Sequence, residues 1–138
     1  MSSLYLKTEA DTEKLAEKLA KNTKPPCVIF LEGPLGAGKT TFLRGFLKGL
    51  GCAERAKSPT FTLLESYEIA AGVVVHMDLY RLKDPLELEA LGFRDYVTDN
   101  AILVIEWAKN AEKLLPKPDI LCTIKIPENG VGRMVELL

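Results

Sequence analysis

One octapeptide constrains the fold of this chain more than any other feature. Gly33 to Thr40 reads Gly-Pro-Leu-Gly-Ala-Gly-Lys-Thr, which fits the phosphate-binding loop pattern of glycine, four residues, glycine, lysine and then serine or threonine. Glycines let the backbone curl so that N–H groups point at phosphate oxygens, and the positive end of a following helix adds attraction. Nucleotide binding is therefore predicted for Gly33, Pro34, Leu35, Gly36, Ala37, Gly38, Lys39, Thr40 and Thr41.

The segments on either side of this motif have the context that it requires. Residues 27–31 form a continuous apolar run, which predicts a strand buried on both faces. Residues 40–50 carry apolar side chains at helical spacing and end before Gly51, a suitable C-cap. The alternative, a glycine-rich turn with an incidental lysine, does not explain this flanking order of strand and helix.

Periodicity elsewhere predicts further helices and strands. Helices are expected at 8–22, where Thr8 and Asp11 are spaced as a capping box, after Asp84-Pro85 up to Gly92, and at 107–115. Strands are expected at 61–69 and 73–80 as a hairpin, at 101–105, and at 120–126 and 132–138 as a second hairpin. These elements predict a single domain, 1–138, with a three-layer α/β fold like that of P-loop NTPases: a mixed, mainly parallel central sheet with antiparallel hairpin additions.

Charge and cysteine usage narrow the class of protein. Against 18 Lys and Arg stand 19 Asp and Glu, a net charge of −1, whereas a protein that holds nucleic acid by phosphate contacts alone is strongly basic. Cys27, Cys52 and Cys122 are an odd number without CxxC pairing, which is typical of reduced thiols in a cytosolic protein. No signal-peptide pattern and no apolar run long enough to cross a bilayer occurs, so a cytoplasmic location without a membrane or DNA partner is expected.

Two carboxylates complement the predicted phosphate loop. Lys39 would reach the β and γ phosphates, and the Thr40 hydroxyl would ligate Mg²⁺. Asp78 and Glu106 each follow a predicted strand, where ligands gather in open α/β sheets. We assign Asp78 to Mg²⁺, directly or through water, and Glu106 to orienting the attacking water at the same metal centre. The alternatives are a turn residue paired with Arg81 for Asp78, and a helix N-terminal acid for Glu106.

Three further residues have open roles. His76, the single histidine, shares a strand face with Asp78 and is more often a structural residue than a catalyst in such a position. Trp107 packs against the core, contacts a partner or stacks on the nucleotide. Thr60, in Ser-Pro-Thr, lies where switch segments place a hydroxyl that senses the γ-phosphate, and a plain turn is the alternative.

Two sequence elements that are absent bear on which nucleotide is bound and how fast it is hydrolysed. The Asn-Lys-x-Asp element that reads guanine in many GTPases is absent, so ATP is preferred. No arginine is marked as a finger, so slow turnover that a partner accelerates is expected. All five candidates fit ordinary surface charges: Arg44, Arg55, Arg81, Arg94 and Arg133. A small-metabolite kinase and a nucleotide-gated binding module without hydrolysis remain as alternatives, although no segment long enough for a kinase lid occurs.

Four segments together resemble the bacterial TsaE (YjeE) family: residues 31–41, 58–61, 76–81 and 105–107. The resemblance spans residues 9–127. It implies a Mg²⁺-dependent ATPase required for threonylcarbamoyl transfer to an adenosine of tRNAs that read codons starting with A. It also implies a TsaB–TsaD heterodimer as partner, with tRNA reached indirectly through that complex.

The same resemblance implies roles for individual residues. Lys39 and Thr40 match the phosphate and Mg²⁺ contacts of the family, Asp78 matches the second Mg²⁺-side residue, and Glu106 matches the hydrolytic acid. A nearly neutral ATPase that acts on tRNA through partners needs no basic groove of its own, so the family expectation agrees with the charge.

Overall fold

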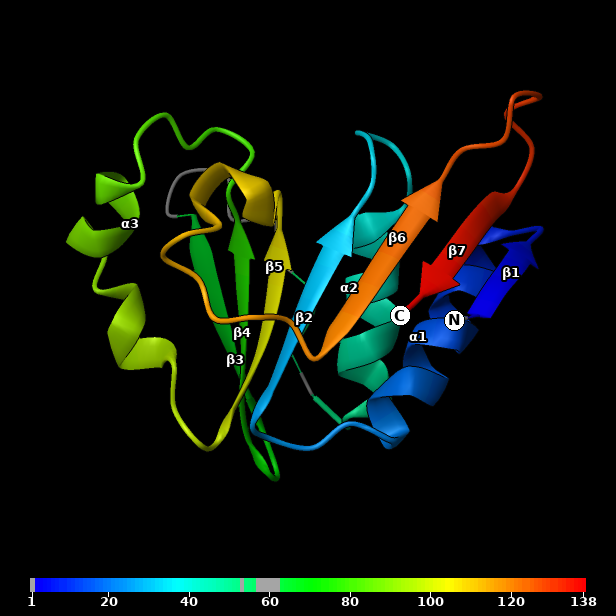
Figure 1. Ribbon diagram of the computed structural model, residues 1–138. Coiled ribbons are helices and arrows are strands. Elements are labelled where there is room, and N and C mark those ends of the chain that lie inside the picture. The colour runs from blue at the N-terminus through cyan, green and yellow to red at the C-terminus, as the bar shows by residue number, and fades with distance from the viewer. Residues whose placement is uncertain (1, 53, 57–62) are drawn as a thin grey trace.

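The computed structural model describes residues 2–52, 54–56 and 63–138. In it the phosphate loop directly follows the middle strand of a mixed sheet. Within these ranges the strand order is β1-β7-β6-β2-β5-β4-β3 (Figure 1). The strands are β1 Ser2–Leu6, β2 Cys27–Glu32, β3 Leu64–Ile69, β4 Gly72–Asp78, β5 Ala101–Glu106, β6 Ile120–Lys125 and β7 Arg133–Leu137. The helices are α1 Glu9–Lys21, α2 Lys39–Gly49, α3 Leu86–Ala90 and the 3₁₀ turns η1 Phe93–Tyr96 and η2 Ala108–Ala111.

Parallel pairing occupies the centre of the sheet and antiparallel pairing its edges. Strands β6, β2, β5 and β4 run parallel to one another. The hairpins β3–β4 and β6–β7 add antiparallel neighbours, as predicted. Strand β1 was not predicted; it pairs antiparallel with β7, with Leu6 opposite Arg133. The predicted mixed α/β sheet is confirmed.

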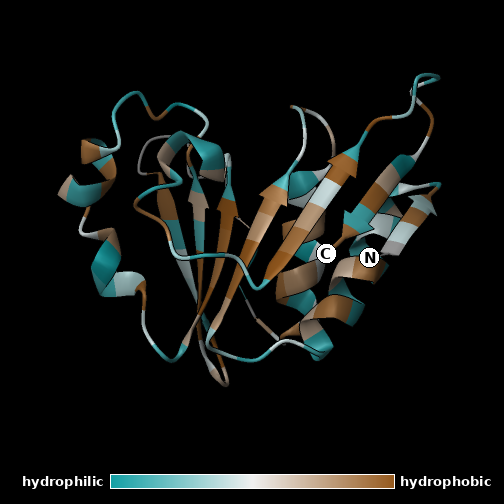
Figure 2. Cartoon of the chain, in the orientation of Figure 1, coloured by the Kyte–Doolittle hydropathy of each residue, from teal (hydrophilic) through white to brown (hydrophobic). Residues whose placement is uncertain are grey.

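Helices cover both faces of this sheet, which gives three layers. Helices α1 and α2 lie together over one face, and α3, η1 and η2 lie over the other (Figure 1). The central strands are apolar along most of their length (Figure 2). Ile102 and Val104 of β5 pack toward α2, whereas Leu103 and Ile105 pack toward the other layer. Because side chains alternate along a strand, Glu106 belongs to the α2 side.

Helices α1 and α2 approach each other closely through two glycines. A Cβ at Gly45 would lie 2.3 Å from the carbonyl oxygen of Glu13, and one at Gly49 would lie 2.6 Å from that of Glu17. The start of α1 is fixed by the predicted capping box, because Thr8 and Asp11 each accept from the other's backbone N–H. Helix α2, which begins in the phosphate loop, is thus held against a capped neighbour.

The predicted helix at 107–115 is wrong. Trp107 has a positive φ of 57°, and only the 3₁₀ helix η2 follows it. The segment must turn back at once from the end of β5 toward β6, so tertiary packing of Ala108, Ala111 and Leu115 against the core replaces a regular helix. This tight reversal places Trp107 beside the phosphate loop.

Two other sequence expectations meet the structure here. Cys27, Cys52 and Cys122 are unpaired thiols. Among the described residues no helix has the length and apolar character needed to cross a membrane. The predicted switch residue Thr60 lies outside the described residues.

Candidate nucleotide-binding site

Three glycines shape the phosphate loop for different reasons. Gly36 and Gly38 have φ values of 79° and 103°, in the left-handed region that glycine adopts without strain. Gly33 follows β2 directly, and a Cβ there would lie 2.7 Å from the carbonyl oxygen of Ile124 on β6. Gly38 is also the N-cap of α2, so the positive end of that helix lies at the phosphate loop, where phosphates would bind.

Lys39 is folded back over the loop. Its Nζ donates to the carbonyl oxygen of Gly33 at 2.7 Å and lies 3.5 Å from Oε1 of Glu106. The same ammonium lies 4.5 Å from the ring centroid of Trp107, a cation–π distance. With 7% of its surface exposed, this lysine is already desolvated and paired, and it faces the acid that the sequence assigns to hydrolysis.

Register brings the two predicted carboxylates side by side. Asp78 is paired with Glu106 across β4 and β5, so both project on the α2 side. Burial, and then the negative charge of Glu106, raise the pKa of Asp78 above its ordinary value, and a hydrogen bond from the Tyr80 N–H partly opposes them. A divalent cation between such carboxylates would relieve their repulsion.

His76 joins this group from one step earlier on β4. Its Nε2 lies 2.5 Å from Oε2 of Glu106, and both residues are buried, at 3% and 6% exposed. Glu106 therefore has one carboxylate oxygen against Lys39 and the other against His76. The His76 Nδ1 is also buried and finds no hydrogen-bond partner among the described residues.

One pocket of about 350 Å³ collects most of the predicted site, a volume within the range of small-molecule sites. Its lining includes Leu35, Gly36, Gly38, Lys39, Thr40, His76, Asp78, Glu106 and Trp107. Thr40, Asp78 and Glu106 offer the oxygen ligands that Mg²⁺ prefers. No group of three or more His, Cys, Asp or Glu residues in the described ranges could hold a metal by itself. Water and phosphate oxygens are the further ligands that a Mg²⁺ ion would take here.

Other predicted loop residues lie elsewhere. Ala37 is fully buried in the core below the loop. Thr41 lines a smaller neighbouring pocket, together with Gly36 and Arg133. Pro34 borders a separate pocket on the opposite side of the loop.

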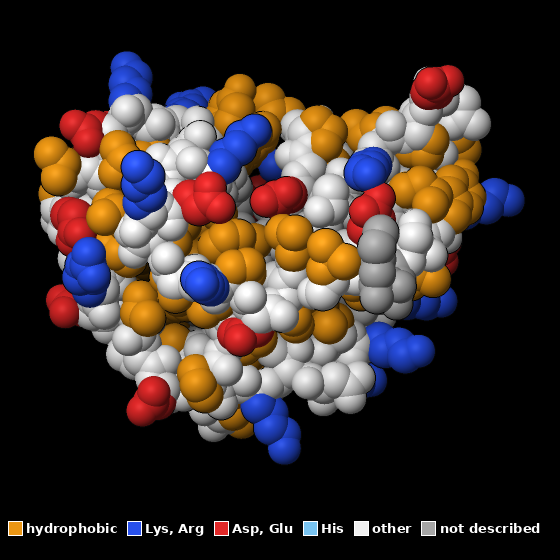
Figure 3. Space-filling model, in the orientation of Figure 1, with side chains coloured by type: hydrophobic (Ala, Val, Ile, Leu, Met, Phe, Trp, Pro, Cys, Tyr) orange, Lys and Arg blue, Asp and Glu red, His pale blue; other side chains and the backbone are white. Residues whose placement is uncertain are grey.

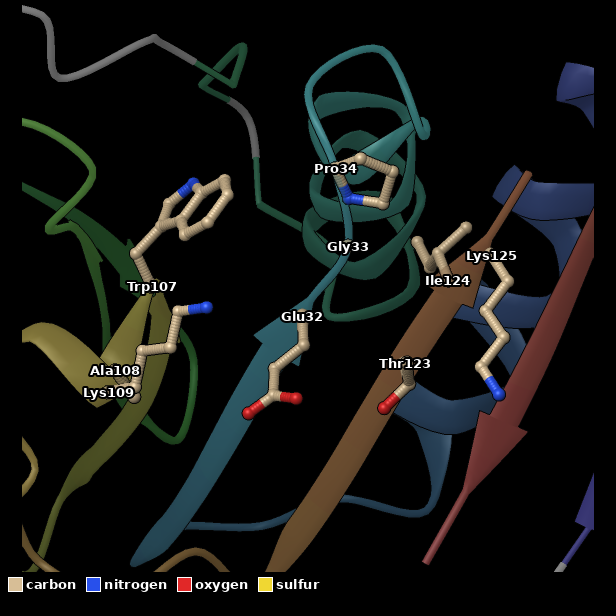
Figure 4. A pocket seen from close by; sticks show the side chains of 9 residues that line it. All are labelled: Glu32, Gly33, Pro34, Trp107, Ala108, Lys109, Thr123, Ile124 and Lys125. Atoms are coloured by element: carbon tan, nitrogen blue, oxygen red, sulfur yellow. The ribbon is translucent and has the colours of Figure 1, made fainter.

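That separate pocket, of about 340 Å³, lies between η2 and the ends of β2 and β6 (Figure 4). Trp107 and Lys109 border it on one side, and Thr123 and Lys125 border it on the other (Figure 4). The space-filling view shows this face hollowed near its upper edge, with acidic and basic side chains at the rim (Figure 3). Since Trp107 lines both pockets, its ring is part of the wall between them.

Arg133 is the site residue that sequence reasoning missed. Its guanidinium donates from Nη2 to the carbonyl oxygen of Gly36 and from Nε to that of Ala37, both at 3.0 Å. The sequence treated this arginine as one of several surface charges. No local signal marks it, because only the pairing of β7 brings it to a loop nearly a hundred residues away.

Comparison with known proteins identifies close relatives. A family profile described as "Threonylcarbamoyl adenosine biosynthesis protein TsaE" matches residues 6–135. The tRNA threonylcarbamoyladenosine biosynthesis protein TsaE of Haemophilus influenzae is 46% identical over 127 residues, which cover 91% of this chain and 79% of that protein. The protein of the same name from Bacillus subtilis is 41% identical over 136 residues, covering 93% and 85%.

A solved structure has the same architecture. The crystal structure of Bacillus subtilis YdiB superposes with a TM-score of 0.81 at 30% sequence identity and covers 99% of this chain and 84% of that one. The strand order, the phosphate loop and the added hairpins thus belong to a fold already seen by crystallography.

Proposed function

This chain belongs to the TsaE family, and from that premise we propose that it is a Mg²⁺-dependent ATPase that serves tRNA threonylcarbamoyladenosine biosynthesis with a TsaB–TsaD heterodimer. The relatives are named for that pathway. The observation that carries the ATPase proposal is the single pocket in which Lys39, Thr40, Asp78 and Glu106 meet.

Each residue has a task that its position supports. The backbone N–H groups of the loop and the N-terminus of α2 bind the phosphates. The Lys39 side chain moves away from Glu106 and Gly33, and its ammonium then contacts the β and γ phosphates. Thr40 and Asp78 would hold Mg²⁺, Asp78 directly or through water. When bound, that ion neutralises charge on the phosphates and orients them.

Hydrolysis depends on the acid that Lys39 leaves behind. The Nζ atom of Lys39 lies 3.5 Å from Oε1 of Glu106. When the ammonium moves to the phosphates, this oxygen becomes available to orient and deprotonate a water molecule. The lysine therefore occupies the acid until a nucleotide draws it away, which links hydrolysis to occupancy of the loop.

The arginine positions support the expectation that turnover is slow without a partner. No arginine lines the phosphate pocket in the described ranges. Arg44 pairs with Glu13, Arg94 pairs with Glu89, and Arg133 faces the carbonyl side of the loop. Charge on the transferred phosphoryl group is thus left for a partner to stabilise, in a cytoplasmic complex that also supplies the tRNA contacts.

Replacing Glu106 with glutamine tests this function. We expect the Glu106→Gln protein to bind ATP, followed by the fluorescence of Trp107, the single tryptophan, and to release no phosphate. With TsaB–TsaD and tRNA it should support at most one round of modification. Full modification activity without phosphate release would contradict the ATPase and favour a nucleotide-gated binding module. Phosphate transfer to an added acceptor instead of water would favour a kinase.

A further inference from the structure

The hydrogen bond between His76 and Glu106 has no function in the mechanism proposed above. Glu106 carries two oxygens with different neighbours: Oε1 lies 3.5 Å from Lys39 Nζ, and Oε2 lies 2.5 Å from His76 Nε2. A carboxylate that accepts at Oε2 requires the proton of this hydrogen bond to be on Nε2, which then donates it. The two oxygens of Glu106 therefore have different partners.

The surroundings of His76 do not call for a histidine on packing grounds. On the same face of the sheet lie Val74, Ile102 and Val104, all apolar and at most 1% exposed, and the half-buried Glu65, which is opposite His76 on β3. An imidazole placed there buries two polar nitrogens, and Nδ1 finds no partner among the described residues. A buried polar atom without a partner destabilises the fold, so an aliphatic side chain would suit the core better. Within the described ranges, the hydrogen bond of the imidazole is with Glu106.

We propose that His76 is a positioning residue for ATP hydrolysis: its Nε2–H holds Oε2 of Glu106 so that Oε1 is the oxygen that faces the phosphate pocket and acts on water. This inference rests on the proposed ATPase function. Lys39 and His76 both contact the carboxylate, and Lys39 leaves it on engaging phosphate. His76 then remains as the described contact that keeps the carboxylate from rotating.

The geometry gives the imidazole an indirect role in hydrolysis, through Glu106. His76 also lines the phosphate pocket, but its hydrogen bond among the described residues is to Glu106 and not to the loop backbone, so we assign it to act through the acid. Neighbours that orient a functional carboxylate or ligand typically affect activity about 10- to 100-fold when removed. Binding of ATP depends on the loop, Lys39 and Thr40, and should change little.

Three variants separate positioning from packing. His76→Leu removes the donor and keeps an apolar core, His76→Gln keeps an N–H donor on a side chain of similar reach, and Val74→Ala disturbs the same face of the same strand without touching Glu106. We expect kcat of His76→Leu to fall about 10- to 100-fold, with KM and the ATP dissociation constant within about two-fold of wild type. His76→Gln should recover most of the loss, and Val74→Ala should keep wild-type kcat despite a lower Tm.

A second readout is independent of turnover. Because the chain has one histidine, a long-range ¹H–¹⁵N spectrum of the full-length, nucleotide-free protein shows a single imidazole. We expect a proton on Nε2 in the wild-type protein, and a mixture of tautomers in Glu106→Ala. A proton fixed on Nδ1 in the wild-type protein would overturn the proposal whatever the kinetics show.

The kinetic outcomes distinguish the two hypotheses. If the wild-type protein hydrolyses ATP and His76→Leu has the same kcat, the positioning role is wrong while the ATPase stands. If kcat of all three variants simply follows their Tm values, His76 is a packing residue. If the wild-type protein hydrolyses no ATP with or without partners, the proposed function fails and takes the positioning role with it.

Discussion

Replacing Gly45 with alanine tests whether the helix behind the phosphate loop is held by backbone packing. The new Cβ would lie 2.3 Å from the carbonyl oxygen of Glu13 and 2.7 Å from its Cα. Ordinary contact begins near 3.4 Å, so α1 and α2 must separate by roughly 1.1 Å, the difference between 3.4 and 2.3 Å. Gly49 meets Glu17 in the same way one turn later, so the helices have no direction in which to slide apart cheaply.

The expected size of the effect follows from two opposing terms. Alanine gains about 1 kcal/mol over glycine in helix propensity, whereas overpacking a well-filled contact costs typically 1–3 kcal/mol and occasionally more. Because the obstructing atoms are backbone on a capped helix, we expect a net loss of about 2 kcal/mol. With an unfolding entropy of about 2.1 cal/mol/K per residue, this corresponds to a Tm lower by about 7 °C for a chain of this length.

Thermal and urea unfolding of wild type, Gly45→Ala and Lys48→Ala measure this effect. Lys48 is exposed on the same helix and pairs with Glu17 at 3.3 Å, so its loss should change the free energy of unfolding by less than about 0.5 kcal/mol. If Gly45→Ala instead raises Tm, as helix propensity alone predicts, the close packing of α1 on α2 is refuted.

Three further predictions concern charge, thiols and the loop. Because the pKa of Asp78 is raised, its contribution to stability is full below the ordinary value of 3.8 and is lost as the pH rises through the folded pKa. The nucleotide-free Asp78→Asn protein should therefore have a higher Tm than wild type at pH 7, and the difference should close as the pH falls toward 3.8. A difference in Tm that does not depend on pH would contradict this. Burial raises the pKa of the Cys122 thiol to about 12, so a thiol reagent near pH 8 should modify the partly exposed Cys52 first. Cys52→Ser should therefore remove the fast phase of thiol modification, and a fast phase that survives would locate a reactive thiol elsewhere. Arg133→Ala should weaken ATP binding about tenfold through loss of hydrogen bonds to loop carbonyls, measured by titrating Trp107 fluorescence, and unchanged affinity would show that the loop keeps its shape unaided.

Local patterns predicted the parts of the site that are contiguous in sequence. The phosphate loop, the strand before it and the helix after it follow from glycine spacing and apolar periodicity alone. Asp78 and Glu106 could be placed at strand ends, and the register of β4 and β5 then brings them together. Alternation likewise placed His76 on the face that it occupies.

Contacts between distant segments could not be predicted in this way. Arg133 reaches the loop only because β7 lies beside β6 in the sheet. On its other side β7 pairs with β1, a strand too short and mixed to be recognised. The helix expected after Glu106 fails for a similar reason, since the need to return to β6 outweighs local propensity and gives Trp107 its positive φ. That reversal, invisible in the residue pattern, puts the indole over Lys39.

The central claim is that this chain hydrolyses ATP as part of tRNA threonylcarbamoyladenosine biosynthesis. The most direct test is phosphate release from ATP and Mg²⁺ by the wild-type protein, alone and with TsaB–TsaD, beside Lys39→Ala as the inactive control. The account predicts slow release by the protein alone, faster release with the partners, and none from the control. Binding of ATP without phosphate release under any of these conditions would contradict it.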